Sequence, residues 1–515
     1  MAGVSRPSGS DVAVAAAGFV AAHQNEDFFN IYYGENFELS YGLATPGHLI
    51  QTAIAHHRAT GEDQFLECAM GVADRVCAQF GGEDFAGHSV IEMALVELYR
   101  STGHNRYLRG AEHFLTPLLR QPPVISHGVL KSGSHLVRQT YLMCGGADYF
   151  AETGVQAYLE KLSAIWNDVT LGKMHLVGSI AVDRKDAEKG ADEAFYLSAG
   201  VKEWAGSTGM ETCATIGNAY WNWRMLAVTG EAVYADLFER ILYNGILAGV
   251  SLDHTTFSYL VPLASLGDHP PRTTWASLSP SCCPPNVLRT IASVPGYIYS
   301  TSESGFWVHL YDNSRVDWHL PDGTEIALSQ KTQYPWEGLV ELEISLERAA
   351  TFDLNLRIPG WCSSPKVEVN GTAVSGVEPG SYCRIHKEWG SGDRVRLDLP
   401  MPVVAVQADP RVQVLQQRLA LMRGPLVYCF EGPDNTDLDL WDINVKTGGH
   451  STRGEGLYQP VGELPEFEPD LEEDLLDGVV VLRGEGGTGR SAAAIPFYAW
   501  GNRGVSPFLT WVSVS

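Results

Sequence analysis

Two stretches contain the same signal for the end of one helix and the start of the next: ATGEDQFLECAMGVADRV at residues 59–76 and STGHNRYLRGAEHFL at residues 101–115. In each, a helical pattern of apolar residues ends at Thr-Gly, a few polar residues follow, and a second pattern with helical spacing begins. The same dipeptide recurs at Thr153-Gly154 and Thr229-Gly230. Because glycine readily adopts the left-handed conformation that ends a helix, each Thr-Gly predicts the turn of a helical hairpin.

The spacing of these turns indicates how the hairpins are arranged. Their intervals are unequal, which disfavours a solenoid of identical repeats. A closed ring of hairpins tolerates unequal loops and can build a site from the loops at one end. The pattern therefore predicts an (α/α) barrel over residues 1–300.

The pattern changes after about Tyr299. Short alternating runs rich in β-branched and aromatic residues, such as GFWVHLYD and LVELEISL, are separated by turn signals every eight to twelve residues. Residues 301–515 are therefore expected to form antiparallel β-sandwich structure, either one domain or two small sandwiches. The acidic, glycine-rich stretch 432–482 is expected to be a long excursion or loop.

Composition narrows the class of protein. The 515 residues carry a formal net charge of −25, which would repel a phosphate backbone and argues against nucleic acid as a partner. No run of 18 apolar residues is present, so no membrane span is expected. Nine cysteines, an odd number, favour reduced thiols in a cytoplasm. The apolar stretch 12–22 is interpreted as an N-terminal helix, although secretion stays open.

The densest chemical signal joins Glu211-Thr212-Cys213 to the Cys282-Cys283 pair. Adjacent cysteines rarely bridge each other, so the pair indicates either a metal or inert buried thiols. Zinc prefers tetrahedral thiolate ligation, and these three cysteines would supply three ligands. Oxygen donors for a fourth position lie upstream in residues 191–195.

Two further features bear on this candidate site. Pro284 and Pro285 favour a helix start after the cysteine pair, where the positive end of the helix dipole would stabilise a thiolate. Glu211 precedes a predicted helix over 213–229, where it is either a residue of the first turn or, two positions before Cys213, an acid/base group facing the same cavity.

Other polar residues open predicted helices. His48, His88 and His135 each stand at the start of an apolar helical stretch, and together they would line one mouth of the barrel. Any one of them alone is typical of a core or capping histidine. Glu239 and Tyr259 are weaker candidates, because each lies in a segment whose other residues explain its presence.

The chain resembles the β-L-arabinofuranosidases of glycoside hydrolase family 127 and the related family 146. The matching text includes PGHLIQTAIAHHRATG, GHSVIEMALVELYRSTG, METCATIGNAYWNWRM, SPSCCPPNVLR, MRGPLVYCFEG and AIPFYAWGNRG, from about residue 45 to near the C-terminus. The ordered pair of elements E-x-C and S-C-C-x-P-N is highly specific.

The resemblance implies a zinc-dependent retaining exo-glycosidase built on an (α/α)6 barrel followed by β-sandwich domains. Its substrate would be a terminal β-L-arabinofuranoside or a similar sugar, with Cys282 as the nucleophile and Glu211 as the general acid/base. It implies Glu193, Cys213, Cys282 and Cys283 as the zinc ligands. It also implies sugar contacts for His48, His88, His135, Glu239 and Tyr259.

Three alternatives stay open at this level. The same cysteine and zinc chemistry could act on another glycoside or a glycosylated small molecule. The zinc could be structural in a sugar-binding protein, because zinc with four protein ligands is ordinarily closed and inert. An (α/α)-barrel epimerase or lyase using His and Tyr is the third. The strands of residues 301–515 also offer edges through which two copies could pair as a homodimer.

Overall fold

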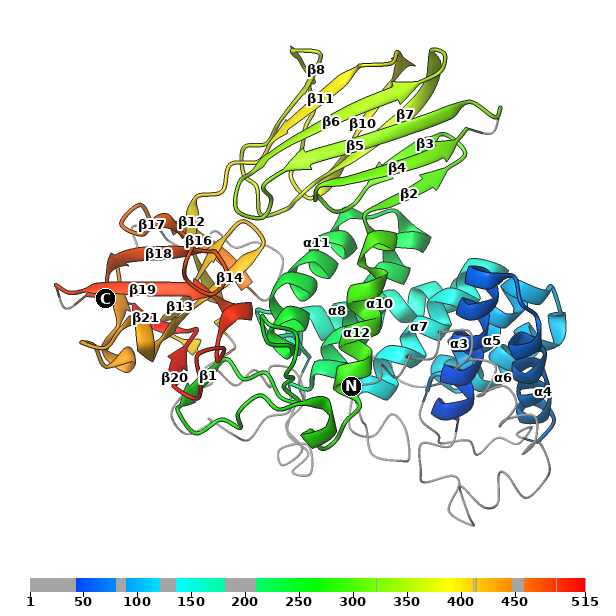
Figure 1. The fold of residues 1–515 in the computed structure, drawn as a ribbon, viewed down its shortest axis with the longest axis horizontal. Helices are drawn as coiled ribbons and strands as arrows, with labels where there is room; N and C mark the ends of the chain where they lie inside the picture. Colours follow the sequence, from blue (N-terminus) through cyan, green and yellow to red (C-terminus); the bar gives the residue numbers. More distant parts are fainter. Residues whose placement is uncertain are drawn as a thin grey trace, which may run out of the picture. The chain divides into compact units, whose positions relative to one another are not determined.

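The protein is described here by a computed structural model. It describes residues 43–79, 89–120, 136–180, 210–320, 322–410, 412, 415–446, 458–487 and 489–514. The chain divides into two compact units, Met1–Val169 and Thr170–Ser515. Figure 1 shows the helices in the blue to green part of the chain and most strands in the yellow-green to red part. His88, His135 and Glu193 lie outside the described residues.

The first unit is built from helical hairpins. The two helices of a hairpin pack against each other, and each hairpin packs against the next one along the chain. Contacts join α3 to α4 and α5, and α5 to α6 and α7. The helices are α3 (Ala44–Thr60), α4 (Gln64–Gln79), α5 (Ile91–Thr102), α6 (Asn105–Arg120) and α7 (Leu136–Thr153), followed by α8 (Gln156–Gly172), which runs across the unit boundary.

The Thr-Gly dipeptides end helices as predicted. Gly103 has φ 69° and its N–H donates to Tyr99 O at 2.7 Å. The Thr102 hydroxyl donates to Leu98 O at 2.7 Å and accepts from the His104 N–H at 3.3 Å. The same pair of threonine hydrogen bonds recurs at Thr60, Thr153 and Thr229. Threonine thus satisfies backbone groups on both sides of the turn, and glycine supplies the left-handed residue.

The helices of the second unit include the two that position Cys213, Cys282 and Cys283. α10 packs against α11 and α12. The predicted helix over 213–229 is confirmed, and the prolines mark a helix start, because α12 begins at Cys283 with proline in its first turn. The elements are α10 (Thr212–Thr229), α11 (Ala232–Arg240), the π-helix η2 (Ile241–Ile246), the 3-10 helices η3 (Leu247–Gly249), η4 (Trp275–Ser277) and η5 (Val294–Tyr297), the strand β1 (Ala264–Leu266) and α12 (Cys283–Ser293).

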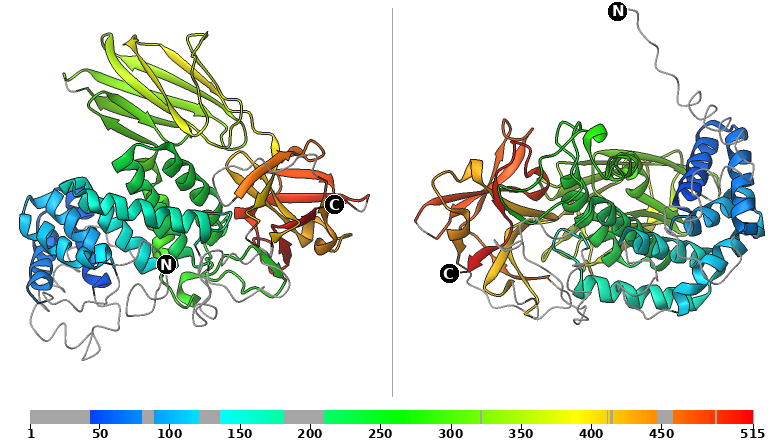
Figure 2. Two further views of the ribbon diagram at one scale, coloured as in Figure 1. Left: turned by 180° about the vertical axis from the view of Figure 1, so that it is seen from behind. Right: turned by 90° about the horizontal axis from the view of Figure 1, so that it is seen from below.

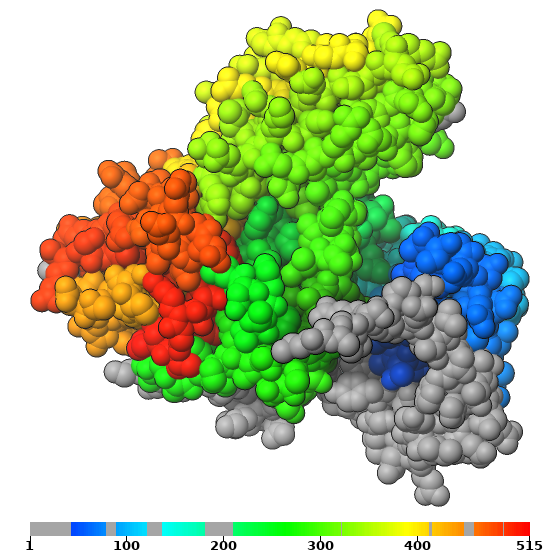
Figure 3. All heavy atoms as spheres, in the orientation of Figure 1, coloured from blue at the N-terminus to red at the C-terminus, as the bar shows by residue number. Residues whose placement is uncertain are grey.

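Two sheets follow, and Figures 1 and 2 show them as two layers of yellow-green to yellow strands. Their buried apolar residues form one core. One sheet has the order β10-β7-β3-β2 and the other the order β4-β5-β6-β11-β8-β9. In the space-filling view these strands form one continuous block (Figure 3). The strands are β2 (Tyr299–Ser302), β3 (Gly305–Val308), β4 (Ser314–His319), β5 (Glu325–Thr332), β6 (Leu339–Leu346), β7 (Ala350–Ile358), β8 (Lys366–Val369), β9 (Thr372–Ala373), β10 (Ser381–Trp389) and β11 (Arg394–Asp398).

The expectation of purely antiparallel pairing is wrong at two places. Asn444 and Val445 pair in parallel with Ser513 and Val514. β3 pairs with β7 in parallel, with Phe306 opposite Leu354. The chain leaves this sheet after β3, forms β4 to β6 in the other layer and returns as β7, and such a crossover permits parallel pairing.

The last part of the chain forms a third sheet with the path β15-β21-β13-β14-β19-β18-β17, to which β12, β16, β1 and β20 attach. One core of this sheet includes Met210, Val261 and Leu263, so the sheet packs against segments beside α10. The strands are β12 (Val403–Ala408), β13 (Arg418–Arg423), β14 (Leu426–Glu431), β15 (Asn444–Val445), β16 (Tyr458–Glu463), β17 (Glu468–Glu472), β18 (Val479–Glu485), β19 (Ser491–Pro496), β20 (Pro507–Leu509) and β21 (Val512–Val514).

The described part of the acidic stretch 432–482 is not all excursion or loop. It contains β15, β16, β17 and the start of β18. β17, with the sequence EPDLE, is mostly exposed and pairs with β18 alone in the path of this sheet. Charged residues and proline suit such an edge strand because they discourage pairing with another chain. The acidic residues of β17 therefore protect a sheet edge.

Among the described residues, no helix has the length and apolar character needed to span a bilayer.

Candidate active site

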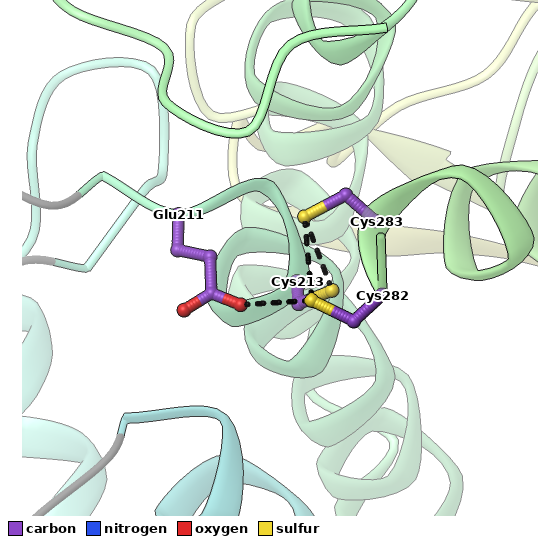
Figure 4. Close-up of side chains that lie close together, drawn as sticks. All are labelled: Glu211, Cys213, Cys282 and Cys283. Atoms are coloured by element: carbon purple, nitrogen blue, oxygen red, sulfur yellow. Dashed lines mark hydrogen bonds between the residues drawn. The ribbon is translucent and has the colours of Figure 1, made fainter. Parts of the chain in front are cut away.

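Glu211, Cys213, Cys282 and Cys283 meet at the starts of two helices (Figure 4). One ligand atom from each lies within 4.8 Å of the others. Cys213 Sγ is 3.3 Å from Cys283 Sγ, and Cys282 Sγ is 3.9 Å from Cys283 Sγ. Cys282 Sγ is also 3.6 Å from Glu211 Oε1. The structure thus joins two motifs about seventy positions apart in sequence.

Local backbone structure places each half of this cluster. Glu211 is the extended residue that precedes α10, with ψ 130°, and forms an isolated bridge with Leu260. On either side of this bridge, the Thr212 N–H donates to Tyr259 O at 3.0 Å and the Val261 N–H donates to Met210 O at 3.1 Å. The segment 259–261, backed by the third sheet, therefore fixes the approach to α10.

The cluster has the dimensions of a zinc site. Tetrahedral zinc with Zn–S about 2.3 Å and Zn–O about 2.1 Å separates two sulfurs by about 3.8 Å and a sulfur from an oxygen by about 3.6 Å. The observed S–S separation of 3.9 Å and the S–O separation of 3.6 Å agree with this arrangement, and the Cys213–Cys283 separation of 3.3 Å is about 0.5 Å shorter. Three cysteines with one carboxylate are also the donor types that zinc prefers. These residues therefore fit zinc.

The three sulfurs differ in exposure and in charge. Cys282 is exposed, whereas the exposed fractions of Cys213 and Cys283 are 1% and 0%. Hydrogen bonds from the Cys213 and Cys283 thiols lower the pKa of Cys282 to about 3. The same hydrogen bonds raise the pKa values of Cys213 and Cys283 above the ordinary thiol value. These hydrogen bonds therefore favour negative charge on Cys282 over the two buried cysteines.

Glu211, expected as the acid/base group, lies next to Cys213, Cys282 and Cys283, whereas Glu193, expected as the fourth ligand, lies outside the described residues. Tyr259, expected to contact sugar, lies beside the cluster. Burial raises the pKa of the Tyr259 phenol, as do the charge of Glu211 and a hydrogen bond to its carboxylate. The structure thus brings Glu211 and Tyr259 to the expected cysteines, and the roles expected of them stay predictions.

Glu239 has other partners. Its Oε1 accepts from Arg357 Nη2 at 2.5 Å and from the Tyr334 hydroxyl at 2.6 Å, and Trp361 Nε1 lies 3.4 Å from Oε2. The Glu239 side chain is 1% exposed. A sugar contact would require this carboxylate to leave Arg357, so here Glu239 lacks the access that the resemblance implies. Its observed role is to join α11 to the first two sheets.

The remaining predicted sugar contacts are the histidines. His48 is half-buried in the first turn of α3, and its ring packs edge-on against Tyr141 with ring centroids 6.4 Å apart. This contact lies within the first unit. The roles expected of His48, His88 and His135 stay predictions.

One polar residue of the site was missed. Asn286 Nδ2 donates to Cys213 Sγ at 3.0 Å. The motif contained a signal for this contact, because residues three apart on a helix share a face and Asn286 follows Cys283 by three positions.

Comparison with known proteins places this chain among the glycoside hydrolases. A family model described as "Beta-L-arabinofuranosidase, GH127 catalytic domain" matches residues 15–296, the GH127 middle domain matches 305–401 and the C-terminal domain of the family matches 403–513. The chain belongs to glycoside hydrolase family 127.

Individual relatives agree with this assignment. The chain is 29% identical over 526 residues to a non-reducing end β-L-arabinofuranosidase of Bifidobacterium longum subsp. longum, covering 90% of this chain and 77% of that protein. A GH127 β-L-arabinofuranosidase from Geobacillus stearothermophilus T6 superposes with a TM-score of 0.80 at 30% identity, covering 95% of this chain and 82% of the other. A GH127 β-arabinofuranosidase gives 0.83 at 29% identity, covering 98% and 84%.

Proposed function

We propose that this chain is a retaining glycosidase that removes terminal β-L-arabinofuranosyl groups, with Cys282 as its nucleophile and zinc as its metal. The substrate class is supported by the family and by the names of its relatives. The observation that carries the catalytic role is the exposure of Cys282 in a cluster whose other sulfurs are buried. A purely structural zinc site would have no need of an exposed ligand.

Glu211, Cys213, Cys282 and Cys283 would hold the metal. When bound, zinc keeps its cysteine ligands deprotonated at neutral pH, so that a thiolate is available as a nucleophile.

The position of Glu211 favours a ligand role over the acid/base role. In retaining glycosidases the nucleophile and the acid/base group are about 5 to 5.5 Å apart, because the sugar bond must fit between them. Glu211 Oε1 is only 3.6 Å from Cys282 Sγ, which is a separation between two ligands of one ion. A second carboxyl group is then needed as acid/base. We propose Glu193, which the family resemblance already assigns to this centre.

The reaction then has two steps carried by side chains. The Cys282 thiolate attacks the anomeric carbon while the Glu193 carboxyl protonates the departing oxygen, which leaves a thioglycoside on Cys282. The Glu193 carboxylate next takes a proton from water, the water oxygen attacks the same carbon, and Cys282 leaves as thiolate. Two inversions at one carbon give overall retention.

Two variants separate the roles of the carboxylates. Glu193→Gln should keep the metal content of the wild type but lose most hydrolysis, least for aryl leaving groups of low pKa that need no protonation. Glu211→Gln should lose metal affinity. Metal content by mass spectrometry and kcat with a leaving-group series measure both. If instead Glu193→Gln loses zinc and Glu211→Gln keeps it, Glu211 is the acid/base and Glu193 the ligand.

Activity on the proposed substrate is the direct test. We expect hydrolysis of 4-nitrophenyl β-L-arabinofuranoside in a panel of aryl pentosides and hexosides, with β-L-arabinofuranose as the first product seen by NMR. Cys282→Ser should be folded and inactive. Preference for another glycoside in the panel would keep the chemistry and change the substrate, whereas an active Cys282→Ser enzyme would refute the nucleophile.

We further propose that the helical hairpins of residues 1–300 close into an (α/α)6 barrel and form the catalytic domain. Residues 301–515 would then support it, as the packing of Val261 and Met210 in the third sheet's core suggests. A crystal structure would test this arrangement.

A further inference from the structure

A polar seam joins α10 to α12 beside the cluster. Asn286 and Thr290 stand one turn apart on α12, and they face Cys213 and Tyr220 of α10. Asn286 Nδ2 donates to Cys213 Sγ at 3.0 Å, and Tyr220 and Thr290 share a hydrogen bond of 2.6 Å between their hydroxyls. The seam therefore has one contact at the cluster and one further along the helices.

The direction of the outer hydrogen bond is settled by its neighbour. The Thr290 hydroxyl donates to Asn286 O at 2.7 Å, so the Tyr220 hydroxyl must donate to Thr290. Both contacts thus tie α12 to α10, but only Asn286 touches a sulfur. A comparison of the two positions can therefore separate helix anchoring from an effect on the metal-binding sulfur.

We infer that Asn286 is a positioning residue whose amide holds Cys213 as a fixed metal ligand, so that Cys282 is the thiolate released to the sugar. This inference rests on the proposed zinc site. Three thiolates around one ion are chemically alike, and the protein must distinguish them. Exposure admits the sugar to Cys282. The amide of Asn286 orients Cys213 Sγ and donates to it, which stabilises the thiolate form that binds metal.

The expected size of the effect follows from similar metal sites. Partners that orient a metal ligand change metal affinity by about 10- to 100-fold when they are replaced. Asn286→Leu, of similar shape, removes the N–H donor, and Asn286→Asp replaces it with a carboxylate that repels the thiolate. We expect both variants to bind zinc about 10- to 100-fold more weakly than the wild type. At saturating zinc, kcat should fall while KM stays within about twofold, because the inferred contact holds a metal ligand and not the sugar.

The control is Thr290→Val, which removes the outer contact of the seam and leaves Asn286 in place. Zinc affinity is measured on the full chain by competition with a chromophoric chelator, and the ligand set is followed by the thiolate-to-metal absorption of the Co²⁺-substituted protein. Circular dichroism and thermal melting check that each variant is folded. Thr290→Val should keep wild-type zinc affinity and the wild-type Co²⁺ spectrum.

Each outcome has a distinct meaning. Weaker zinc binding and an altered Co²⁺ spectrum in the folded Asn286 variants, with Thr290→Val unchanged, support the inference. Wild-type affinity in both Asn286 variants overturns it and leaves the proposed function standing. Equal losses in Thr290→Val and Asn286→Leu also overturn it, because the seam would then act only as a helix anchor. A wild-type protein that binds no zinc refutes the proposed metal site and this inference with it.

Discussion

Replacing Glu239 by Gln tests whether this residue holds the fold or binds sugar. Arg357 is fully buried, and its guanidinium is paired with Glu239 and with Asp236, each at 2.5 Å. The variant keeps the shape of the side chain but removes one of the two charges that compensate Arg357. Gln also presents an N–H₂ group where Arg357, Tyr334 and Trp361 already supply donors.

The cost can be bounded from these contacts. Breaking a buried ion pair by removing one partner costs about 3–5 kcal/mol. Asp236 is 19% exposed and remains as a partner, so we take the lower end and expect Glu239→Gln to lower the free energy of unfolding by about 3 kcal/mol. The matched control is Asp317→Asn, because the Arg315–Asp317 pair has a similar length of 2.7 Å but both side chains are exposed. No measurable change is expected there.

The assay is urea unfolding followed by tryptophan fluorescence, together with kinetics on 4-nitrophenyl β-L-arabinofuranoside under conditions in which the variant is folded. We expect a lower unfolding midpoint and a KM close to that of the wild type. A variant as stable as the wild type with a KM raised tenfold or more would show that the carboxylate binds sugar. It would then refute the structural role given to Glu239.

Three other predictions concern backbone space, pH and the metal. An added Cβ at Gly338 would lie 1.8 Å from Leu399 O, so Gly338→Ala should lower the free energy of unfolding by about 3 kcal/mol. An added Cβ at Gly103 meets no atom within 4 Å, so Gly103→Ala should cost only about 1 kcal/mol, because of the φ of 69°. Thermal melts of the two variants test this difference. Burial lowers the pKa of His309 to about 3, below the unfolded value of about 6.5, so the unfolded chain binds more protons between these values. The free energy of unfolding should therefore fall as pH falls below about 6, by up to about 1.4 kcal/mol per pH unit. Urea titrations at several pH values should show that the free energy of unfolding of His309→Gln depends less steeply on pH. Removal of zinc by a chelator should abolish hydrolysis, added zinc should restore it, and persistent activity in metal-free protein would contradict the proposed centre.

Much of the fold could be predicted because its signals are local. Thr102 and Gly103 end a helix through hydrogen bonds that reach no further than four residues, and the same chemistry repeats at Thr229 and Gly230. The prolines after Cys283 mark a helix start for the same reason. Composition misjudged the stretch 432–482, because acidity suits an edge strand as well as a loop. The homodimer stays a prediction.

By itself, the sequence singled out Glu211, Cys213 and the Cys282-Cys283 pair as candidates for chemistry and predicted that they act together. The tertiary structure decided how they are grouped: it set Glu211 3.6 Å from Cys282, brought Asn286 to Cys213, and buried Glu239 against Arg357. The physical reason is the separation along the sequence between the groups that interact. Turns and helix ends depend on backbone groups a few residues apart, whereas contacts across α10, α12 and the sheets depend on how whole elements pack.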